Sequence, residues 1–304
     1  MLYKEWLSEW LENYVKTSVK ERTYAKYADI VKIRLIPALG DYDLNDLTPL
    51  IVQRYITELL HHGNLKTGNG LSPNTVNLII VVIQSSTKAA YSLGLTDEYK
   101  MDKIKRPRVQ EKQITCFSPS EQKMIEQAVL TDKRNKMIGI LICLYTGLRV
   151  GELLALEWTD IDLSKNELSV NKTCHDKGKS RVTTTPKTTS SVRIIPIPKQ
   201  LVPILKQRKK QYKSQYVISE NGMYISIRSY QRSFELLLKR LGIPHQGFHS
   251  LRHTFATRAL ECGMDVKTLS EILGHKNATV TLNRYTHSLM DHKRDMMNRL
   301  GKFL

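Results

Sequence analysis

The sequence has few cysteines and no long apolar stretch. Its four cysteines are scattered, without the C-x-x-C spacing of a metal site, at Cys116, Cys143, Cys174 and Cys262. This pattern favours free thiols, so we expect no disulfide framework, no metal and no other cofactor. No run of about 18 apolar residues is present, which excludes a membrane-spanning helix. The N-terminal MLYKEWLSEW is amphipathic rather than a signal peptide, and we expect a cytosolic protein with no membrane partner.

Acidic residues are scarce relative to basic ones. The 304 residues include 47 Lys and Arg against 29 Asp and Glu, a net charge of +18. Residues 1–108 hold 15 basic and 12 acidic side chains, a net +3, whereas residues 109–304 hold 32 and 17, a net +15. A hydrophobic fraction of 41% is sufficient for folded cores. Such a charge is typical of a folded protein with a polyanionic partner and indicates nucleic acid.

The first hundred residues have helical periodicity. Apolar residues recur at helical spacing in four stretches, residues 4–16, 21–39, 47–60 and 72–94. Ser72 is a good capping residue, and Pro73 fits the first position of the helix that follows it. We therefore predict an all-helical domain at residues 1–102, followed by a basic interdomain linker at residues 103–115.

Residues 116–304 have a mixed pattern. Residues 135–163 predict two helices interrupted at Thr146 and its glycine neighbour, with Thr146 capping the second helix. The stretches NELSVNKTC and SSVRIIPIP alternate or are β-branched, and a polar, basic connection separates them. They predict an antiparallel hairpin or a three-stranded sheet, with helices again toward the C-terminus. The expected fold class is mainly α with a small antiparallel β-sheet.

Basic and imidazole side chains cluster in HSLRHTFATRALECG. His249, Arg252 and His253 are spaced i, i+3 and i+4, so on a helix they share one face. An imidazole and a guanidinium each need a partner or water, which makes an anion the natural ligand. His275 follows a second predicted helix, and Tyr285 lies ten residues beyond it.

Two further positions carry less information when taken alone. Arg149 and Glu152 in TGLRVGELLAL are spaced i, i+3, which is also the spacing of an ordinary surface ion pair. Lys187 in TPKTTSSVRIIPI lies near a predicted strand turn, where a solvated lysine is equally common. Three other lysines are close enough in sequence to take its place: Lys172, Lys177 and Lys179.

Together these residue types suit the attack of a tyrosine hydroxyl on a phosphodiester. Arg149 and Arg252 offer planar forks to the non-bridging oxygens, where negative charge accumulates in the transition state. A tyrosine of ordinary pKa about 10 must lose its proton, which a nearby histidine and cationic surroundings assist. Lys187 is a candidate general acid for the departing sugar oxygen. The reaction needs no metal, ATP or water nucleophile.

These motifs resemble those of the tyrosine recombinases of the phage-integrase type. TGLRVGELLAL resembles the box with the first catalytic arginine, and TPKTTSSVRIIPI resembles the β-hairpin lysine motif. HSLRHTFAT resembles the His-x-x-Arg box, and LGHKNATVTLNRYTH resembles the His and Tyr box. The resemblance covers nearly the whole chain. It implies a helical core-binding domain at residues 1–102 and a mostly helical catalytic domain with a C-terminal helix or tail at residues 116–304.

The resemblance also implies the direct catalytic roles. Arg149 and Arg252 would hold the scissile phosphate, and Lys187 would protonate the leaving 5′ oxygen. Tyr285 would form the 3′-phosphotyrosine.

Supporting roles follow in the same way. His249 and His275 would assist proton transfer and oxyanion binding, and Glu152 would support the site. We interpret His253 as a packing residue of its helix.

The function implied is that of a site-specific recombinase, an integrase or transposase that integrates or excises a mobile element. The implied partners are double-stranded DNA at the element ends and the target site, three further copies in a tetramer, and DNA-bending accessory proteins. The C-terminal helix would dock on a neighbouring copy, and the protein would act at the bacterial nucleoid. Two alternatives stay open: a catalytically silent DNA-binding regulator on the same fold, and a type IB topoisomerase.

Overall fold

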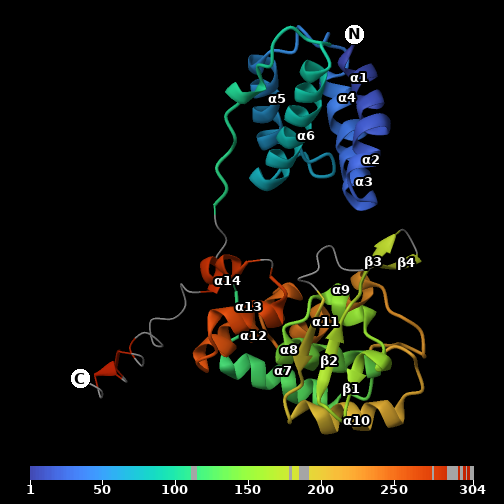
Figure 1. Cartoon of the computed structure of the whole chain (residues 1–304), viewed down its shortest axis with the longest axis vertical. Helices are drawn as coiled ribbons and strands as arrows, with labels where there is room; N and C mark the ends of the chain where they lie inside the picture. Colours follow the sequence, from blue (N-terminus) through green and yellow to red (C-terminus); the bar gives the residue numbers. More distant parts are fainter. Residues whose placement is uncertain are drawn as a thin grey trace. The chain divides into compact units, whose positions relative to one another are not determined.

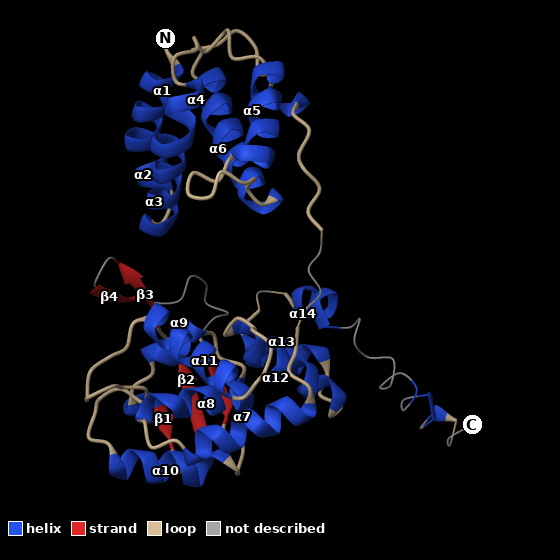
Figure 2. Cartoon of the chain, turned by 180° about the vertical axis from the view of Figure 1, so that it is seen from behind, coloured by secondary structure: helices blue, strands red, loops and turns tan. Residues whose placement is uncertain are grey.

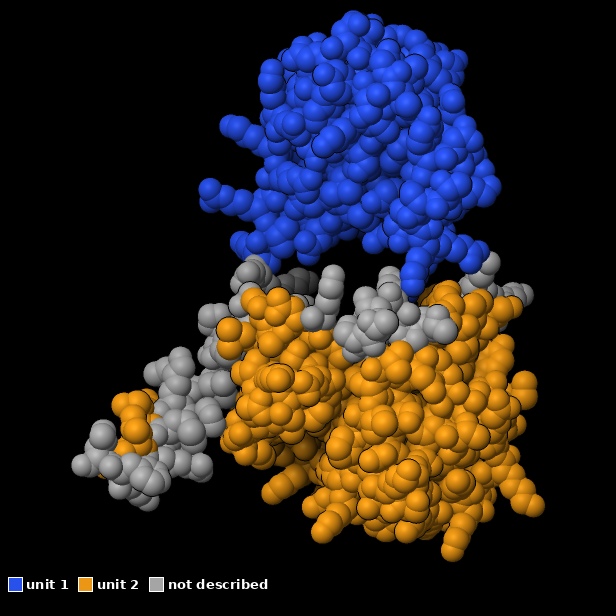
Figure 3. Space-filling view, viewed as in Figure 1, with its two compact units in different colours: residues 1–112 blue, residues 113–304 orange. Residues whose placement is uncertain are grey.

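The chain folds into two compact units. The computed structural model describes residues 1–110, 115–177, 180–184, 192–275 and 277–285, with positions 294, 297, 298, 300 and 301 beyond them (Figure 1). Unit 1 comprises Met1–Lys112 and unit 2 comprises Gln113–Leu304 (Figure 3). Each unit has a hydrophobic core of its own. The assignment of DNA binding to the first domain and catalysis to the second stays a prediction.

In its described residues, unit 1 is built from helices and their connecting loops (Figure 2). They are α1 (Tyr3–Trp10), α2 (Lys16–Ser18), α3 (Glu21–Ile30), α4 (Ile36–Leu39), α5 (Pro49–His62) and α6 (Pro73–Ser92). The π-helical turns η1 (Leu11–Val15) and η2 (Val31–Leu35) join α1 to α2 and α3 to α4. The first four segments therefore behave as two long helices.

The sequence sets where α5 and α6 begin. The Thr48 hydroxyl accepts a hydrogen bond from the backbone N–H of Ile51, and the Ser72 hydroxyl accepts one from Thr75. A proline follows each cap at the first helical position, where its missing N–H leaves no hydrogen bond unmade. The cap expected at Ser72 is confirmed.

The core of unit 1 lies between these helices. Trp6, Leu35, Ile56 and Ile79 are all buried. The indole N–H of Trp6 donates to the carbonyl of Ser86 at 2.8 Å, so this large side chain is buried without an unpaired polar atom. The chain after α6 stays against the unit through the 3-10 turn η3 (Met101–Lys103).

Unit 2 combines ten helical segments among its described residues with two small sheets. The helices are α7 (Pro119–Thr131), α8 (Ile138–Thr146), α9 (Val150–Ala155), α10 (Leu201–Gln211), α11 (Ile227–Arg240), α12 (His249–Glu261), α13 (Val266–Leu273) and α14 (Ala278–Tyr285). Two 3-10 turns complete the set, η4 (Asn135–Met137) and η5 (Trp158–Asp160).

Helix α8 is the centre of unit 2. Its sequence IGILICLYT is apolar on nearly every side, which is typical of a fully enclosed helix. It packs against α7, α9, α10 and α12. Gly147 ends it in the left-handed conformation with φ of 66°, so the predicted interruption after Thr146 is confirmed. The helix thus crosses the unit from η4 to the residues that begin α9.

The strands form two antiparallel sheets. β1 (Ile161–Asp162), β2 (Glu167–Val170) and β5 (Arg193–Pro196) form a three-stranded sheet in the order β1-β2-β5. β2 and β5 lie in the two stretches predicted as strands, whereas β1 lies at the end of a stretch predicted to be helical. β3 (Thr173–Lys177) and β4 (Ser180–Thr184) form a separate hairpin. The sequence pattern assigned most of this hairpin to a polar connection, because its residues lack the alternation of a half-buried strand.

The fold class predicted from the sequence is confirmed. The chain is mostly helical, and small antiparallel sheets occur in unit 2 alone among the described residues. No helix in the described part of the chain is long and apolar enough to cross a membrane. Within the same residues, no three His, Cys, Asp or Glu side chains are grouped so that they could hold a metal ion.

We predict that Gly139→Ala destabilises unit 2 by about 1–3 kcal/mol, because overpacking a filled core forces side chains from their preferred positions. A Cβ at Gly139 would lie 2.3 Å from the Tyr230 hydroxyl oxygen and 3.0 Å from both Ile218 and Leu153 side chains. Thermal unfolding of the full chain measures the effect.

The Tyr230 hydroxyl offers a matched test of this clash. It is buried and has no hydrogen-bond partner among the described groups. Tyr230→Phe should therefore cost little alone and should recover most of the lost stability when combined with Gly139→Ala. A double variant no more stable than Gly139→Ala contradicts the packing argument.

Candidate active site

Arg149 occupies the N-cap of α9, directly after the turn at Gly147. Its backbone N–H donates to Glu152 Oε2 at 3.0 Å, and its Nη1 donates to Glu152 Oε1 at 2.8 Å. The Glu152 carboxylate thus both caps α9 and orients the guanidinium of Arg149. Thr146 does not cap α9 as expected. Its hydroxyl donates to the carbonyl of Ile142 inside α8 instead, because the helix continues through Thr146 before Gly147 ends it.

Arg252 lies on the first turn of α12 and is 2% exposed. Its Nη1 donates to the carbonyl of Gly147 at 2.8 Å. Its Nη2 donates to the carbonyl of Leu273 at 2.8 Å and lies 2.8 Å from Nε2 of His275. One buried guanidinium therefore joins the end of α8, the end of α13 and the imidazole that follows α13.

His275 stands just beyond Gly274, which ends α13 in the left-handed conformation with φ of 65°. A guanidinium donates hydrogen bonds but cannot accept them, so Nε2 of His275 must be the acceptor toward Arg252. The proton of the neutral ring then sits on Nδ1, which lies 2.7 Å from the Thr281 hydroxyl of α14. Thr281 is fully buried. This hydrogen-bond chain connects Arg252 to α14.

The last carbonyls of α13 are the point at which the arginines converge. Arg149 donates to the carbonyls of Leu273 at 3.3 Å and Gly274 at 3.4 Å. These groups have no partner inside the helix and carry the negative end of its dipole. The guanidinium of Arg149 stays 39% exposed, whereas Arg252 is enclosed. The cluster therefore presents positive charge to solvent from one side.

A third arginine, Arg193 at the start of β5, belongs to the same cluster. Its Nη2 lies 3.0 Å from Glu152 Oε2, its Nη1 lies 3.3 Å from Glu152 Oε1, and its Nε donates to the carbonyl of Ile272. Its side chain is 7% exposed. A Cβ on Gly274 would lie 2.9 Å from Arg193 Nη1, so glycine is needed there for space as well as for its left-handed backbone.

The sequence interpretation did not include Arg193, although a signal exists. Arg193 and Ile195 are two residues apart in β5, so their side chains share one face of the strand. Because Ile195 is buried, the charged side chain of Arg193 points toward the interior. A charge on a buried strand face requires a partner. That partner is Glu152.

Burial and charge act in opposite directions on Glu152. Burial by itself would raise the pKa of the carboxyl. Hydrogen bonding and charge from Arg193, with a smaller contribution from Arg149, outweigh burial and lower the pKa below its ordinary value. Glu152 is therefore a buried carboxylate that stays ionised.

Other predicted site residues are placed differently. His249 is exposed, and its ring packs edge-on against His253 with 4.5 Å between the centroids. The side chain of Arg252 points toward the ends of α8 and α13, where it donates to two carbonyl groups. Tyr285 ends α14, four residues after Thr281, and its side chain lies outside the described residues, as Lys187 does.

Lys172, one of the alternatives to Lys187, is engaged elsewhere. Its ammonium lies 2.7 Å from Glu157 Oε2 and 2.9 Å from Asp160 Oδ2. Burial opposes its charge, but the two carboxylates outweigh burial and raise its pKa. The side chains of Lys177 and Lys179 lie outside the described residues.

We predict that Arg193→Gln lowers the free energy of unfolding of unit 2 by about 3 kcal/mol, since loss of one partner leaves a buried charge poorly compensated. Arg193→Lys should recover only part of it, because an ammonium cannot reproduce the planar fork. Thermal unfolding tests both. The control is Arg232→Gln, which removes an exposed pair with Glu235 and should change stability by less than about 0.5 kcal/mol. Equal effects of the two glutamine variants would contradict the assigned role.

We also predict a pH-dependent difference between the wild type and Glu152→Gln. Because the native pKa of Glu152 lies below its ordinary 4.5, the unfolded chain takes up the proton first as the pH falls. The contribution of ionised Glu152 to stability is therefore complete above its ordinary pKa. It is lost as the pH falls through the pKa of Glu152 in the folded protein. The gap in melting temperature should be large at about pH 6 and should shrink below about pH 4.5. A constant gap would argue against an ionised Glu152.

The chain matches two family models. The model of the phage integrase family matches residues 116–292, and that of the N-terminal SAM-like domain of phage integrases matches residues 2–60. A tyrosine recombinase XerC-like protein of Caldanaerobacter subterraneus subsp. tengcongensis is 31% identical over 324 residues, which covers 96% of this chain and 81% of the relative. The ICEBs1 integrase of Bacillus subtilis is 27% identical over 280 residues, which covers 88% and 75%.

Solved structures share the fold. The Tn1549 transposon integrase in complex with transposon right end DNA has a TM-score of 0.83 at 22% identity, covering 99% of this chain and 100% of that one. A lambda integrase tetramer bound to a Holliday junction has a TM-score of 0.71 at 19% identity, covering 92% and 79%. With matching family models on both units and a recombinase relative along nearly its whole length, the chain belongs to the phage integrase family and is a site-specific tyrosine recombinase of mobile elements.

Proposed function

We propose that this recombinase cuts and rejoins DNA strands of a mobile element through a covalent 3′-phosphotyrosine on Tyr285. The observation that carries the proposal is the convergence of Arg149, Arg252 and His275 on the last turn of α13, one short loop away from the helix that ends at Tyr285. The scissile phosphate binds on the solvent side of this convergence.

Arg149 and Arg252 divide the work of holding the phosphate. Arg149 is partly exposed, so its guanidinium can turn toward a non-bridging oxygen while Glu152 keeps it in place. Arg252 is fixed by two carbonyls and the imidazole, which prevents reorganisation when negative charge develops. His275 assists oxyanion binding by holding the guanidinium of Arg252 through Nε2, and His249 assists proton transfer from the exposed start of α12.

The chemical step conserves the number of phosphodiester bonds. The Tyr285 oxygen attacks phosphorus while its proton passes to an imidazole of the site. The bond from phosphorus to the 5′ oxygen breaks, and the 5′ oxygen takes a proton from Lys187. The two ion pairs of Lys172 support Lys187 as the acid, because Lys172 is committed to Glu157 and Asp160. Reversal of the step with a different 5′ hydroxyl completes strand exchange.

We further propose that double-stranded DNA at the element ends and target site is the substrate, and that four copies assemble on two duplexes. The net charge of +18 supports a DNA partner, and the lambda integrase tetramer on a Holliday junction supports the assembly. DNA-bending proteins assist, and the C-terminal helix of one copy docks on its neighbour. Whether the reaction integrates or excises is then decided by the DNA ends and assembly rather than by bond energy.

We predict that Tyr285→Phe abolishes covalent joining while it leaves DNA binding within about twofold, since only the nucleophilic oxygen is removed. The substrate is a nicked suicide duplex that carries the element's own end, incubated in EDTA and analysed on a denaturing protein gel. The matched control is Tyr224→Phe, which removes a partly exposed hydroxyl of the same unit. It should join DNA as the wild type does.

Each alternative function has its own outcome. Tight binding of the element end without any covalent product from the wild type would support the silent DNA-binding regulator. Relaxation of a supercoiled plasmid that lacks the element's sequence would support a topoisomerase. Undiminished covalent product from Tyr285→Phe would exclude Tyr285 as the nucleophile.

A further inference from the structure

A second strongly basic surface lies far from the site described above. Helix α10 and the two residues after it contribute Lys206, Lys209, Lys210 and Lys213, all exposed. Figures 1 and 2 place α10 at one end of unit 2, while α9, α13 and α14 lie at the other end. The central helix α8 spans the distance between them. A duplex held by Arg149 and Arg252 therefore lies on the other face of the unit.

The pattern of α10 separates its two faces completely. Leu201, Leu205 and Arg208 are buried, whereas beyond the first turn the exposed side chains are lysine or glutamine. Lys206, Lys209 and Lys210 are spaced i, i+3 and i+4 on the helix, so they share one stripe, and Lys213 follows two residues after the helix ends. Like charges at this spacing repel one another and weaken a helix. A surface that serves solubility alone normally mixes charges of both signs.

In the part of the chain that the structure describes, none of Lys206, Lys209, Lys210 and Lys213 makes an ion pair within 4.0 Å. The nearby carboxylates are already neutralised, Asp132 by Arg134 and Arg240, and Glu220 by Lys136. The positive charge of Lys206, Lys210 and Lys213 therefore reaches solvent without a neighbouring carboxylate, while the Lys209 ammonium lies 5.8 Å from the centre of the Trp158 ring.

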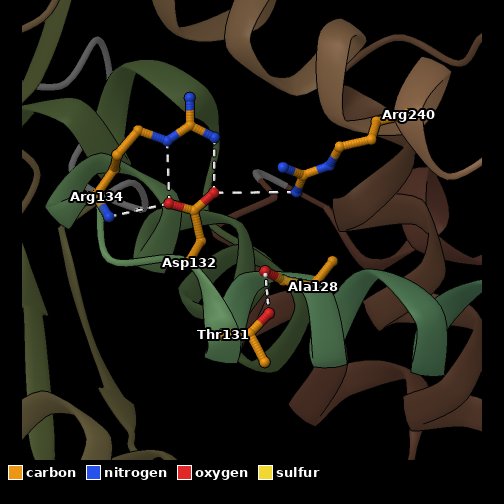
Figure 4. A pocket seen from close by; sticks show the side chains of 5 residues that line it. All are labelled: Ala128, Thr131, Asp132, Arg134 and Arg240. Carbon is orange, nitrogen blue, oxygen red and sulfur yellow. Dashed lines mark hydrogen bonds and ion pairs between the residues drawn. The ribbon is translucent and has the colours of Figure 1, made fainter.

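The surface is rigid and extends beyond α10. The buried guanidinium of Arg208 donates to the carbonyl of Asp132 at 2.8 Å, and the Tyr212 hydroxyl donates to the carbonyl of Lys133. These bonds fix the end of α10 against the loop after α7. Figure 4 shows that loop, where Arg134 and Arg240 flank a depression of about 620 Å³ from opposite sides of Asp132.

We propose that the lysine stripe of α10, with the adjacent loop of Lys133 and Arg134, binds the phosphate backbone of a second segment of double-stranded DNA. Lys206 and Lys210 are about 6 Å apart along the helix axis. Phosphates of one DNA strand repeat about every 3.4 Å of duplex axis, so a row of lysines reaches successive phosphates. After its first turn, the exposed side chains of α10 are lysine and glutamine, which suits backbone contacts that do not depend on sequence. The proposal rests on the proposed function only in taking DNA as the polyanion.

The first test maps the lysines that DNA covers. The full chain is acetylated with and without a 40-bp duplex of mixed sequence, at one to four duplexes per chain, and each lysine is quantified by mass spectrometry. Lys206, Lys209, Lys210 and Lys213 should become protected, whereas Lys123 of α7 and Lys165 of the β1–β2 turn should not. Equal reactivity of the stripe at every ratio would overturn the proposal. Protection that needs only a higher protein concentration would mean that a second copy covers α10, which would overturn it as well.

The second test measures the attraction itself. Beads that carry a biotinylated 40-bp duplex are loaded with protein and then offered a fluorescent duplex of the same length. The triple variant Lys206→Gln, Lys210→Gln and Lys213→Gln should retain the second duplex at least fivefold less, with a salt dependence of the binding constant shallower by about 2.7 in logarithmic slope. A control with the same charge loss, Lys123→Gln, Lys165→Gln and Arg232→Gln, should behave as the wild type. Equal loss in both would show a general effect of charge and refute the stripe.

The outcome is separable from that of the proposed function. Covalent joining by the wild type without protection of the lysine stripe would refute the second DNA site and leave the phosphotyrosine mechanism in place. Protection of the lysines and retention of the second duplex, without any covalent product, would support the second DNA site and refute the phosphotyrosine mechanism. Tyr285→Phe should retain the second duplex as the wild type does.

Discussion

The site depends on how the end of α13 satisfies its last carbonyl groups. Ile272, Leu273 and Gly274 have carbonyls that no helical N–H can reach, and they lie in the interior of unit 2. Guanidinium groups from three different elements donate hydrogen bonds to these carbonyls instead. The same hydrogen bonds that satisfy the helix end therefore assemble α9, α12 and β5 around one point, so structural necessity and the placement of positive charge cannot be separated.

Glu152 makes this concentration of positive charge tolerable. Three guanidiniums within one cluster repel each other, and a single buried carboxylate between Arg149 and Arg193 offsets much of that repulsion. The net charge that is left, about two positive charges, suits a phosphodiester that gains charge during reaction. The remaining positive charge of the cluster is therefore neutralised best when an anion is bound.

Much of this arrangement could be predicted from the sequence, and the limits have physical causes. Helix periodicity and the capping residues located the helices of unit 1, because these signals are local. The motif residues Arg149, Arg252 and His275 were also identified. Arg193 was not, because its partner lies 41 positions away and only the strand register brings them together. The helical spacing of His249 and Arg252 places both on one face of α12, but it does not show where the arginine side chain ends, because its carbonyl partners are distant in sequence.

Thr281 has a consequence for how activity can be switched. Its hydroxyl links the imidazole of His275 to the helix that ends at Tyr285, the proposed nucleophile. If α14 leaves this position, Nδ1 loses this hydrogen bond, which helps to hold the ring in the tautomer that accepts from Arg252. Under the proposed mechanism, departure of the helix would remove Tyr285 and release the imidazole of His275 together. One movement of α14 would therefore switch off both contributions, and its return would restore both.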